Sequence, residues 1–333
     1  MGIFSDPLMN MVKRMVFRVT FARLSVRLSG RLSGHLGYLQ WHRAALGLVT
    51  GLCASLALTI GPAFSAGSDA PRAVSPDLLP QHSLSSIVGI DDEQISCFMG
   101  GANNGNILKA EELAKKFSGP MEYRLYSLDG AGETATAVAL PVNEGSEGEC
   151  ADLWRHEMAF DPRKAGRFSA ALFPANPGRN PLPEVLESLK TPQPEHVALV
   201  TAFLKRRNVA TPDVRIVQTV RTDLDGDGHD DWIINAVRHQ PDKARKGDYS
   251  IILVLRGLES GTRTYIVQDE VTLDDSPYPS ILWVNKIVSV LDVDGDGAYE
   301  IILTGAYIYG GGWEVIRFQD GSFEHVLFCG CDG

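Results

Sequence analysis

Asp223-Leu-Asp-Gly-Asp-Gly-His-Asp-Asp231 and Asp292-Val-Asp-Gly-Asp-Gly-Ala-Tyr-Glu300 are two copies of one nine-residue pattern. Each copy has carboxylates at positions 1, 3, 5 and 9 and glycine at positions 4 and 6. Four carboxylates in so short a segment repel one another unless a cation lies between them. Hard oxygen ligands in this number suit Ca2+, which takes about six to eight oxygens. The pattern therefore predicts two calcium sites, with ligands from Asp223, Asp225, Asp227, the backbone carbonyl of His229, Asp231, and from Asp292, Asp294, Asp296, the backbone carbonyl of Ala298 and Glu300.

An EF-hand opens with the same ligands, but it needs a bidentate glutamate at position 12 and a helix on each side. Position 12 is Ile234 in the first copy and Leu303 in the second. The flanking segments are short and β-branched, without helical periodicity, which predicts strands at 214–220, 232–237, 286–291 and 301–304. The predicted unit is a strand, an acidic loop and a second strand, with the acid at position 9 replacing the late glutamate.

An Asp-x-Asp-x-Asp-Gly-x-x-Asp/Glu loop between two strands resembles the FG-GAP/VCBS-type calcium loops of integrin-like β-propellers and of many exported bacterial proteins. The resemblance covers residues 211–333. It implies calcium binding, propeller-like repeats and export, and it names neither a partner nor a reaction.

The first loop begins at Asp223 and the second at Asp292, and further strand patterns follow each of them. These predicted strands are 249–255 and 264–268 in the first repeat, and 313–318 and 323–328 in the second. Four strands make one propeller blade, and a closed ring needs about four to eight blades. We therefore expect an α+β protein whose β-rich C-terminal half consists of two four-stranded, blade-like calcium repeats. A small or incomplete β-propeller is the alternative.

The N-terminus has the pattern of a secretory signal. Seven basic residues and one acid precede an uncharged, apolar run at 44–60, which Gly61-Pro62 and small residues up to Ala66 follow. A basic region, an apolar core and a small-residue exit are typical of a cleaved signal peptide. We expect the signal at 1–66, no stable membrane span after cleavage, and a periplasmic or extracellular location. An uncleaved membrane anchor at 44–60 is the alternative.

Charge and cysteine content agree with export. Loss of residues 1–66 removes seven of the 31 basic and one of the 41 acidic residues, which leaves a formal net charge of −16. So acidic a chain would be repelled by phosphate, which argues against a nucleic-acid partner. The remaining cysteines, Cys97, Cys150, Cys329 and Cys331, are an even set compatible with two disulfides, and the sequence leaves all three pairings open.

The chain between the signal and the repeats predicts a linker at 67–84 and an α+β region at 85–207, followed by the tandem calcium-loop repeats at 208–333. Helical spacing predicts helices at 106–117, 183–190 and 194–207, and strands are predicted at 123–128 and 134–142.

Two functions fit these patterns. The first is a non-enzymatic, exported calcium-binding protein in which Ca2+ braces the β repeats for structure, or for interaction with a protein or glycan at the cell envelope. The second is an exported hydrolase with its active site in 85–207. The adjacent His156 and Glu157 are candidates for a catalytic pair, but side chains next to each other on a strand point to opposite faces, which favours a structural interpretation. The stretch Tyr307–Trp313, with its three glycines, is expected to be a tight hairpin rather than a ligand-contacting surface.

Overall fold

The computed structural model describes residues 84–91, 96–117, 119, 121–143, 153–159, 169–173 and 178–331. The predicted signal at 1–66, the alternative anchor at 44–60 and nearly all of the predicted linker at 67–84 lie outside these residues. Within the described part of the chain, no helix has the length and apolar character needed to cross a membrane. The helices found there are α2 (Ala110–Ala114) and α3 (Pro194–Arg206), and the regular structure is otherwise antiparallel β-sheet.

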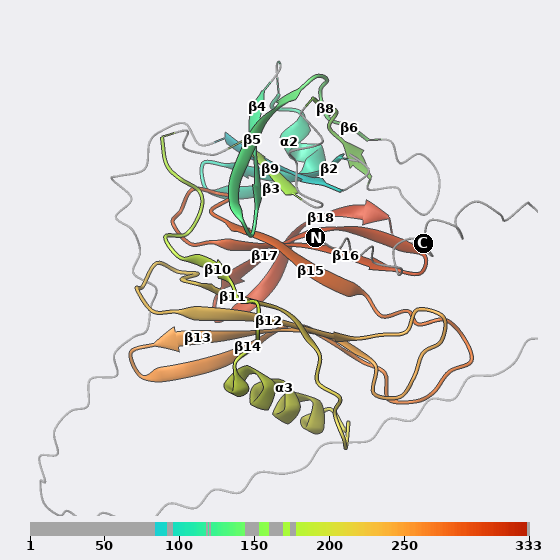
Figure 1. The fold of residues 1–333 in the computed structure, drawn as a ribbon. Helices are drawn as coiled ribbons and strands as arrows, with labels where there is room; N and C mark the ends of the chain where they lie inside the picture. The colour runs from blue at the N-terminus through green and yellow to red at the C-terminus, as the bar shows by residue number, and fades with distance from the viewer. Residues whose placement is uncertain are drawn as a thin grey trace, which may run out of the picture. The chain divides into compact units, whose positions relative to one another are not determined.

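The described strands form three larger sheets and one short pair (Figure 1). The first sheet has the order β3-β2-β1-β9-β4-β5-β8, from β1 (Leu84–Ile90), β2 (Ser96–Asn103), β3 (Asn106–Lys109), β4 (Glu122–Ser127), β5 (Gly130–Ala137), β8 (Met158–Ala159) and β9 (Ser169–Phe173). The second runs in chain order through β10 (Leu186–Ser188), β11 (Ile216–Thr222), β12 (Asp231–Arg238), β13 (Tyr249–Leu258) and β14 (Gly261–Val271). The third runs likewise through β15 (Val284–Leu291), β16 (Glu300–Tyr307), β17 (Gly310–Gln319) and β18 (Ser322–Cys331). The short pair is β6 (Val142–Asn143) with β7 (Trp154–Arg155).

The third sheet is a middle layer, buried on both faces. On one face Val288, Leu291 and Val315 pack against Ile87 and Met99 of the first sheet. On the other face its alternate residues, Ile287, Val290, Ile301, Leu303 and Ile316, pack against Val220, Ile233, Ile252 and Val254 of the second sheet. Figure 1 shows the orange and red strands of the third sheet between the other two sheets. The near-continuous apolar runs of β15 and β16 follow from this burial, because side chains on both faces leave water.

The helix α3 covers the second sheet. Its residues Val200, Phe203 and Leu204 recur at helical spacing and pack on a buried patch of the sheet: Ile234, Ala236, Tyr249, Ile251 and Leu253. Pro194 occupies the first turn, where a missing N–H costs nothing, and Lys205 and Arg206 lie in the last turn, where they complement the helix dipole.

The predicted fold class is confirmed in its β-rich C-terminal half of four-stranded antiparallel sheets. The strand predicted at each side of both acidic loops is present, as are the later strands of each repeat, the helix at 194–207 and the hairpin at 307–313. The helix predicted at 183–190 is wrong, because Leu186–Ser188 pairs with β11 as the edge strand β10. The helix predicted at 106–117 is only partly correct: residues 106–109 pair with β2 as β3, and the helix itself is the short α2. In both cases pairing with a neighbouring strand outweighs local propensity.

A disulfide joins Cys97 of β2 to Cys329 of β18 and so links the first sheet to the third. Both half-cystines are buried in the core that these sheets share. Cys331 is disulfide-bonded as well, whereas Cys150 lies outside the described residues. The expectation of disulfides in this chain is confirmed.

Hydrogen bonds from polar side chains join the second sheet to the third. The Gln218 amide donates from Nε2 to the Ile287 carbonyl at 2.9 Å, and its Oε1 accepts from the Ile287 N–H at 2.8 Å. Gln218 and Ile287 each border a β-bulge of their own strand, where ladder pairing is interrupted. The single glutamine thus gives both the N–H and the carbonyl of Ile287, on the edge strand β15, a hydrogen-bond partner from the second sheet.

Replacing Gln218 with alanine should destabilise the fold by ~2 kcal/mol, because the N–H and C=O of Ile287 then lose their partner. Urea unfolding measures the change. The control is Val217→Ala on the same strand, where the side chain is 56% exposed and a loss below ~0.5 kcal/mol is expected. Equal losses in the two variants would contradict this role of Gln218.

Candidate metal sites

The two acidic loops occupy equivalent places in the two repeats. The first connects β11 to β12 and the second connects β15 to β16, so each acid at position 9, Asp231 or Glu300, is the first residue of the outgoing strand. The glycines at positions 4 and 6 of both loops have positive φ, between 70° and 98°, which explains the need for glycine there. The buried side chain at position 2, Leu224 or Val293, anchors each loop to the core.

The loops lie side by side. The N–H of Tyr299, in the second loop, donates to the carbonyl of Leu224, in the first, at 2.9 Å. A Cβ placed on Gly226 would lie 3.8 Å from the carbonyl oxygen of Gly297. The carboxylates at positions 1, 3, 5 and 9 of both loops, eight in all, are thus gathered at one end of two stacked sheets.

In the first loop, carboxylate oxygens of Asp223, Asp225 and Asp227 lie within 4.8 Å of one another. Asp223 also accepts hydrogen bonds from the N–H groups of Gly226 and Gly228, both at 2.8 Å, which closes the turn. Asp231 lies outside this cluster. Its two oxygens accept from the N–H groups of Leu224 and Gly257, each at 2.9 Å.

In the second loop, the cluster consists of Asp292, Asp294 and Glu300, again with carboxylate oxygens within 4.8 Å of one another. All three side chains are buried, whereas those of the first cluster are half-buried or exposed. Glu300 accepts from the Val293 N–H through Oε2 at 2.8 Å, and its buried Oε1 accepts no hydrogen bond from the described residues. Because glutamate is one methylene longer than aspartate, Glu300 can accept the Val293 N–H with one oxygen while its carboxylate still lies beside Asp292 and Asp294.

The remaining predicted ligands have local roles in both loops. The N–H of His229 donates to Asp227 at 2.8 Å, and the N–H of Ala298 donates to Asp296 at 2.8 Å. These paired distances show that positions 5 and 7 have the same geometry in each repeat. The structure thus clusters three acids in each loop and places Asp231 and Asp296 beside them.

Burial dominates the electrostatics of these acids. It raises the pKa of Asp292 to about 6 and that of Asp294 to about 7, with a further increase at Asp294 from the charge of Asp296. Burial and the charge of Asp294 raise the pKa of Glu300 well above its ordinary value. In the first loop, burial raises the pKa of Asp231 to about 6. Such carboxyls ionise at neutral pH at the expense of stability, unless a cation offsets their charge.

Three arginines that the sequence patterns did not single out approach these acids. Arg256 of β13 forms an ion pair with Asp225. Arg317 of β17 forms ion pairs with Asp294 at 3.1 Å and Asp296 at 2.9 Å. Arg179, from the segment 178–182, lies 3.5 Å from Asp292 and donates to the Gly295 carbonyl at 3.4 Å. The same segment bonds the second loop through the Pro181 carbonyl, which accepts from the Asp292 N–H at 2.8 Å.

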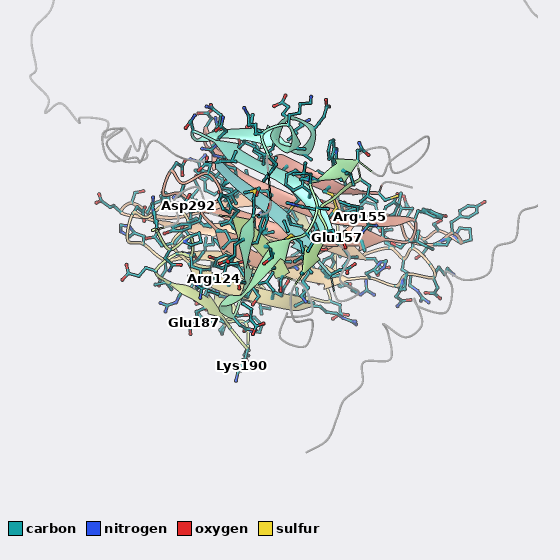
Figure 2. All side chains as sticks on the ribbon, turned by 90° about the horizontal axis from the view of Figure 1, so that it is seen from above. Arg124, Arg155, Glu157, Glu187, Lys190 and Asp292 are labelled. Carbon is teal, nitrogen blue, oxygen red and sulfur yellow. A yellow bond between two sulfur atoms is a disulfide. The ribbon has the colours of Figure 1, made fainter. Side chains whose placement is uncertain are left out.

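His156 and Glu157 do not converge. His156 is buried among the rings of Phe98, Phe117 and Tyr123, its Nδ1 lies 3.1 Å from the Tyr123 hydroxyl, and burial lowers its pKa to about 4. The Glu157 side chain is exposed, and Figure 2 shows it apart from Asp292 of the second loop. The structural interpretation of His156 is therefore confirmed: it is a neutral core residue.

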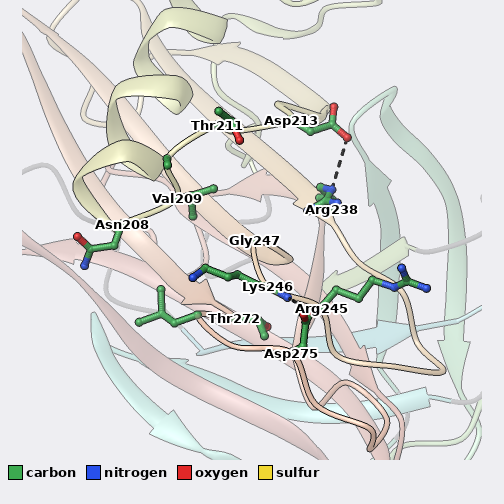
Figure 3. Close-up of a pocket in the computed structure, with 12 residues that line it drawn as sticks. Asn208, Val209, Thr211, Asp213, Arg238, Arg245, Lys246, Gly247, Thr272 and Asp275 are labelled. Carbon is green, nitrogen blue, oxygen red and sulfur yellow. Dashed lines mark hydrogen bonds and ion pairs between the residues drawn. The ribbon is translucent and has the colours of Figure 1, made fainter.

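A cavity of about 400 Å3 lies where the end of α3 meets the turns of the second sheet (Figure 3). Its lining includes Arg238, Arg245 and Lys246 together with Asp213 and Asp275. Arg238 pairs with Asp213 at 3.4 Å. None of the clustered acids lines this cavity, so it is separate from the acidic loops.

Comparisons with protein-family models, curated proteins and solved structures found no match to this chain. The class of site is therefore defined by the geometry alone: two adjacent, arginine-flanked clusters of three carboxylates, each on a glycine-containing turn between antiparallel strands.

The raised pKa values give a testable pH dependence for the ion-free protein. A carboxyl with a folded-state pKa above its unfolded value favours the fold below the unfolded pKa, and this contribution is lost as the pH rises through the folded pKa. Asp294→Asn cannot ionise, so in metal-free buffer the variant should be more stable than the parent by ~2 kcal/mol at pH 8, and the difference should nearly vanish only at about pH 4, close to the unfolded pKa of an aspartate. Urea unfolding at both pH values measures the difference.

The matched control is Asp274→Asn, at an exposed acid outside the loops, which should leave stability unchanged at both pH values. If the free energies of unfolding of Asp294→Asn and the parent differ by the same amount at both pH values, ionisation of the Asp294 carboxyl does not destabilise the fold.

Proposed function

We propose that this chain is an exported calcium-binding protein whose two acidic loops hold Ca2+ and thereby brace stacked, blade-like β repeats of the FG-GAP/VCBS type. Its task is structure or interaction rather than catalysis. The ligands at the first site are Asp223, Asp225 and Asp227, and those at the second are Asp292, Asp294 and Glu300.

The observation that carries the proposal is the buried Oε1 of Glu300, which accepts no hydrogen bond from the described residues and belongs to a cluster of three buried acids. Arg317 Nε lies 3.9 Å from it, beyond hydrogen-bond distance. A buried carboxylate oxygen without a donor costs considerable free energy, and a bound cation removes that cost. Asp225 Oδ1 in the first loop is likewise buried and accepts no hydrogen bond from the part of the chain that the structure describes.

The donor set favours Ca2+ over other divalent ions. All clustered ligand atoms are carboxylate oxygens, which suit hard cations, and no cysteine or histidine belongs to either cluster. Mg2+ requires near-octahedral geometry and retains its waters, whereas Ca2+ accepts a flexible cage of protein oxygens. The deeply buried second cluster therefore fits Ca2+ better.

Export is supported by the Cys97–Cys329 disulfide, because such bonds persist in oxidising compartments. The basic and apolar pattern of residues 1–66 supports it independently. Ca2+ is plentiful outside the cytoplasm, where extracellular calcium-binding modules have dissociation constants of about 10⁻⁴–10⁻³ M. A structural ion of modest affinity is adequate there.

The bracing role follows from where the loops lie. The first loop belongs to the second sheet and the second loop to the third sheet, and a backbone hydrogen bond joins the loops directly. An ion in each loop would neutralise the carboxylates that otherwise repel one another across this contact. The interface between the sheets, with Leu224 and Ile287 in one core, would then be stabilised by metal.

Calorimetric titration of the full-length, metal-stripped protein with Ca2+ should show two binding events. Glu300→Gln should weaken Ca2+ binding at the second site at least ~10-fold, and Asp225→Asn should do the same at the first site, since each variant loses a charged ligand. The control Glu259→Gln, at an exposed turn acid, should bind two ions. Saturating Ca2+ should also stabilise the parent, by ~2.7 kcal/mol at 100 times the dissociation constant.

Absence of binding by the parent, or two unaltered events in both loop variants, would overturn the proposal. Binding of Mg2+ with equal affinity, measured in a parallel titration, would overturn the assignment to Ca2+ while leaving the sites.

A further inference from the structure

The same arginine contact is built into both repeats. Trp232 pairs with Leu255 across β12 and β13, and Ile301 pairs with Ile316 across β16 and β17. One residue further along each third strand is an arginine, Arg256 or Arg317, which thus lies across from the acid at position 9. Two strands of different sequence bring the same side chain to the same place.

The contacts of the two guanidinium groups match. Arg256 pairs with Asp225 at position 3, and its Nε lies 3.8 Å from Asp231 at position 9. Arg317 pairs with Asp294 at position 3, and its Nε lies 3.9 Å from Glu300 at position 9. In each loop, one arginine spans the same two carboxylates.

These arginines are held firmly. Arg256 is 5% exposed, and its guanidinium lies 4.5 Å from the centroid of the Phe318 ring. Arg317 is 20% exposed and has a second carboxylate partner in Asp296. Because a buried guanidinium keeps its charge, each one is a permanent cation beside its cluster.

We propose that Arg256 and Arg317 are built-in counter-cations that compete with the divalent ion for the carboxylates at positions 3 and 9. They keep each loop closed when the ion is scarce, and they reduce metal affinity to a range in which the sites respond to changes in ion concentration. This inference rests on the proposed calcium binding.

The competition has an electrostatic basis. A guanidinium that shares carboxylates with a bound divalent cation lies within a few ångströms of a like charge, and water screens that repulsion poorly at buried sites. Removing the arginine charge leaves the ion-free loop with uncompensated acids and the ion-bound loop without a repulsive neighbour. Both effects increase the affinity for metal.

The test uses the full-length protein, with Ca2+ alone as the probe, in calorimetry and in thermal unfolding with and without the ion. Arg317→Gln should tighten the second site ~10-fold, and Arg256→Gln should do the same at the first. Each variant should lower the melting temperature of the ion-free protein more than that of the calcium-saturated protein.

Two further variants separate contact from general charge. Arg221→Gln removes a positive charge that pairs with Asp230, a loop residue outside the first cluster, and should alter affinity less than ~2-fold. Arg317→Lys keeps the positive charge but loses the planar, bidentate guanidinium group. Its affinity for Ca2+ should stay within ~3-fold of that of the parent. This lysine variant keeps the test valid if Arg317→Gln does not fold without the ion.

The outcomes are distinct. If the parent binds Ca2+ and the glutamine variants bind no more tightly, or if Arg317→Lys tightens binding as much as Arg317→Gln, the competition is overturned and the proposed function stands. If the parent does not bind and a glutamine variant does, the competition is supported and the proposed function of the parent fails. If no variant binds, both are overturned.

Discussion

The rest of the structure depends on the compensation of the carboxylates at positions 1, 3, 5 and 9 of the two loops, which are gathered at one end of two stacked sheets. The backbone hydrogen bond from Tyr299 to Leu224 holds the two loops together, so neither cluster can relax by moving away from the other. Backbone N–H groups, turned inward by glycines with positive φ, offset part of the charge. Arginines offset more, and in each loop three of the acids bring carboxylate oxygens within 4.8 Å of one another. The sheets can stack at this end only because the negative charge is balanced locally.

The part of this arrangement that is local in sequence could be predicted from the sequence. Within each short loop the pattern specifies the acids, the glycines and the turn, and the β-branched flanks specify the strands, so the strand–loop–strand unit was predictable. The helix α3 was predictable for the same reason, since its apolar stripe and Pro194 lie within one short segment. Leu186–Ser188 was not predictable, because its strand conformation comes from pairing with β11, which lies beyond α3 in the chain.

The arginines show why the complete site was not predictable. The interval from Arg256 to Arg317 is shorter than the interval from Asp223 to Asp292, so aligning the repeats by their loops does not align the arginines. The cause is the connection between the second and third strands, which spans residues 239–248 in the first repeat and 308–309 in the second. The pairing register of the strands nevertheless places Arg256 and Arg317 at equivalent positions, each across from the acid at position 9 of its loop. A search for cations on the third predicted strand of each repeat, extended by one residue beyond its end, would have found them.

The two loops, although equivalent in register, differ in what they can do. The second lies on the middle sheet next to the segment 178–182, and its clustered acids are buried. Glu300 accepts the Val293 N–H through one oxygen, and its other oxygen accepts no hydrogen bond from the described residues. In the first loop, the shorter Asp231 uses both oxygens on backbone N–H groups, and the clustered acids are accessible to solvent. A buried ion exchanges slowly because its ligands and the covering segment must move, whereas an accessible ion exchanges with the medium. For the calcium binding that we propose, the second loop would therefore exchange its ion more slowly than the first, although both sites respond to ion concentration.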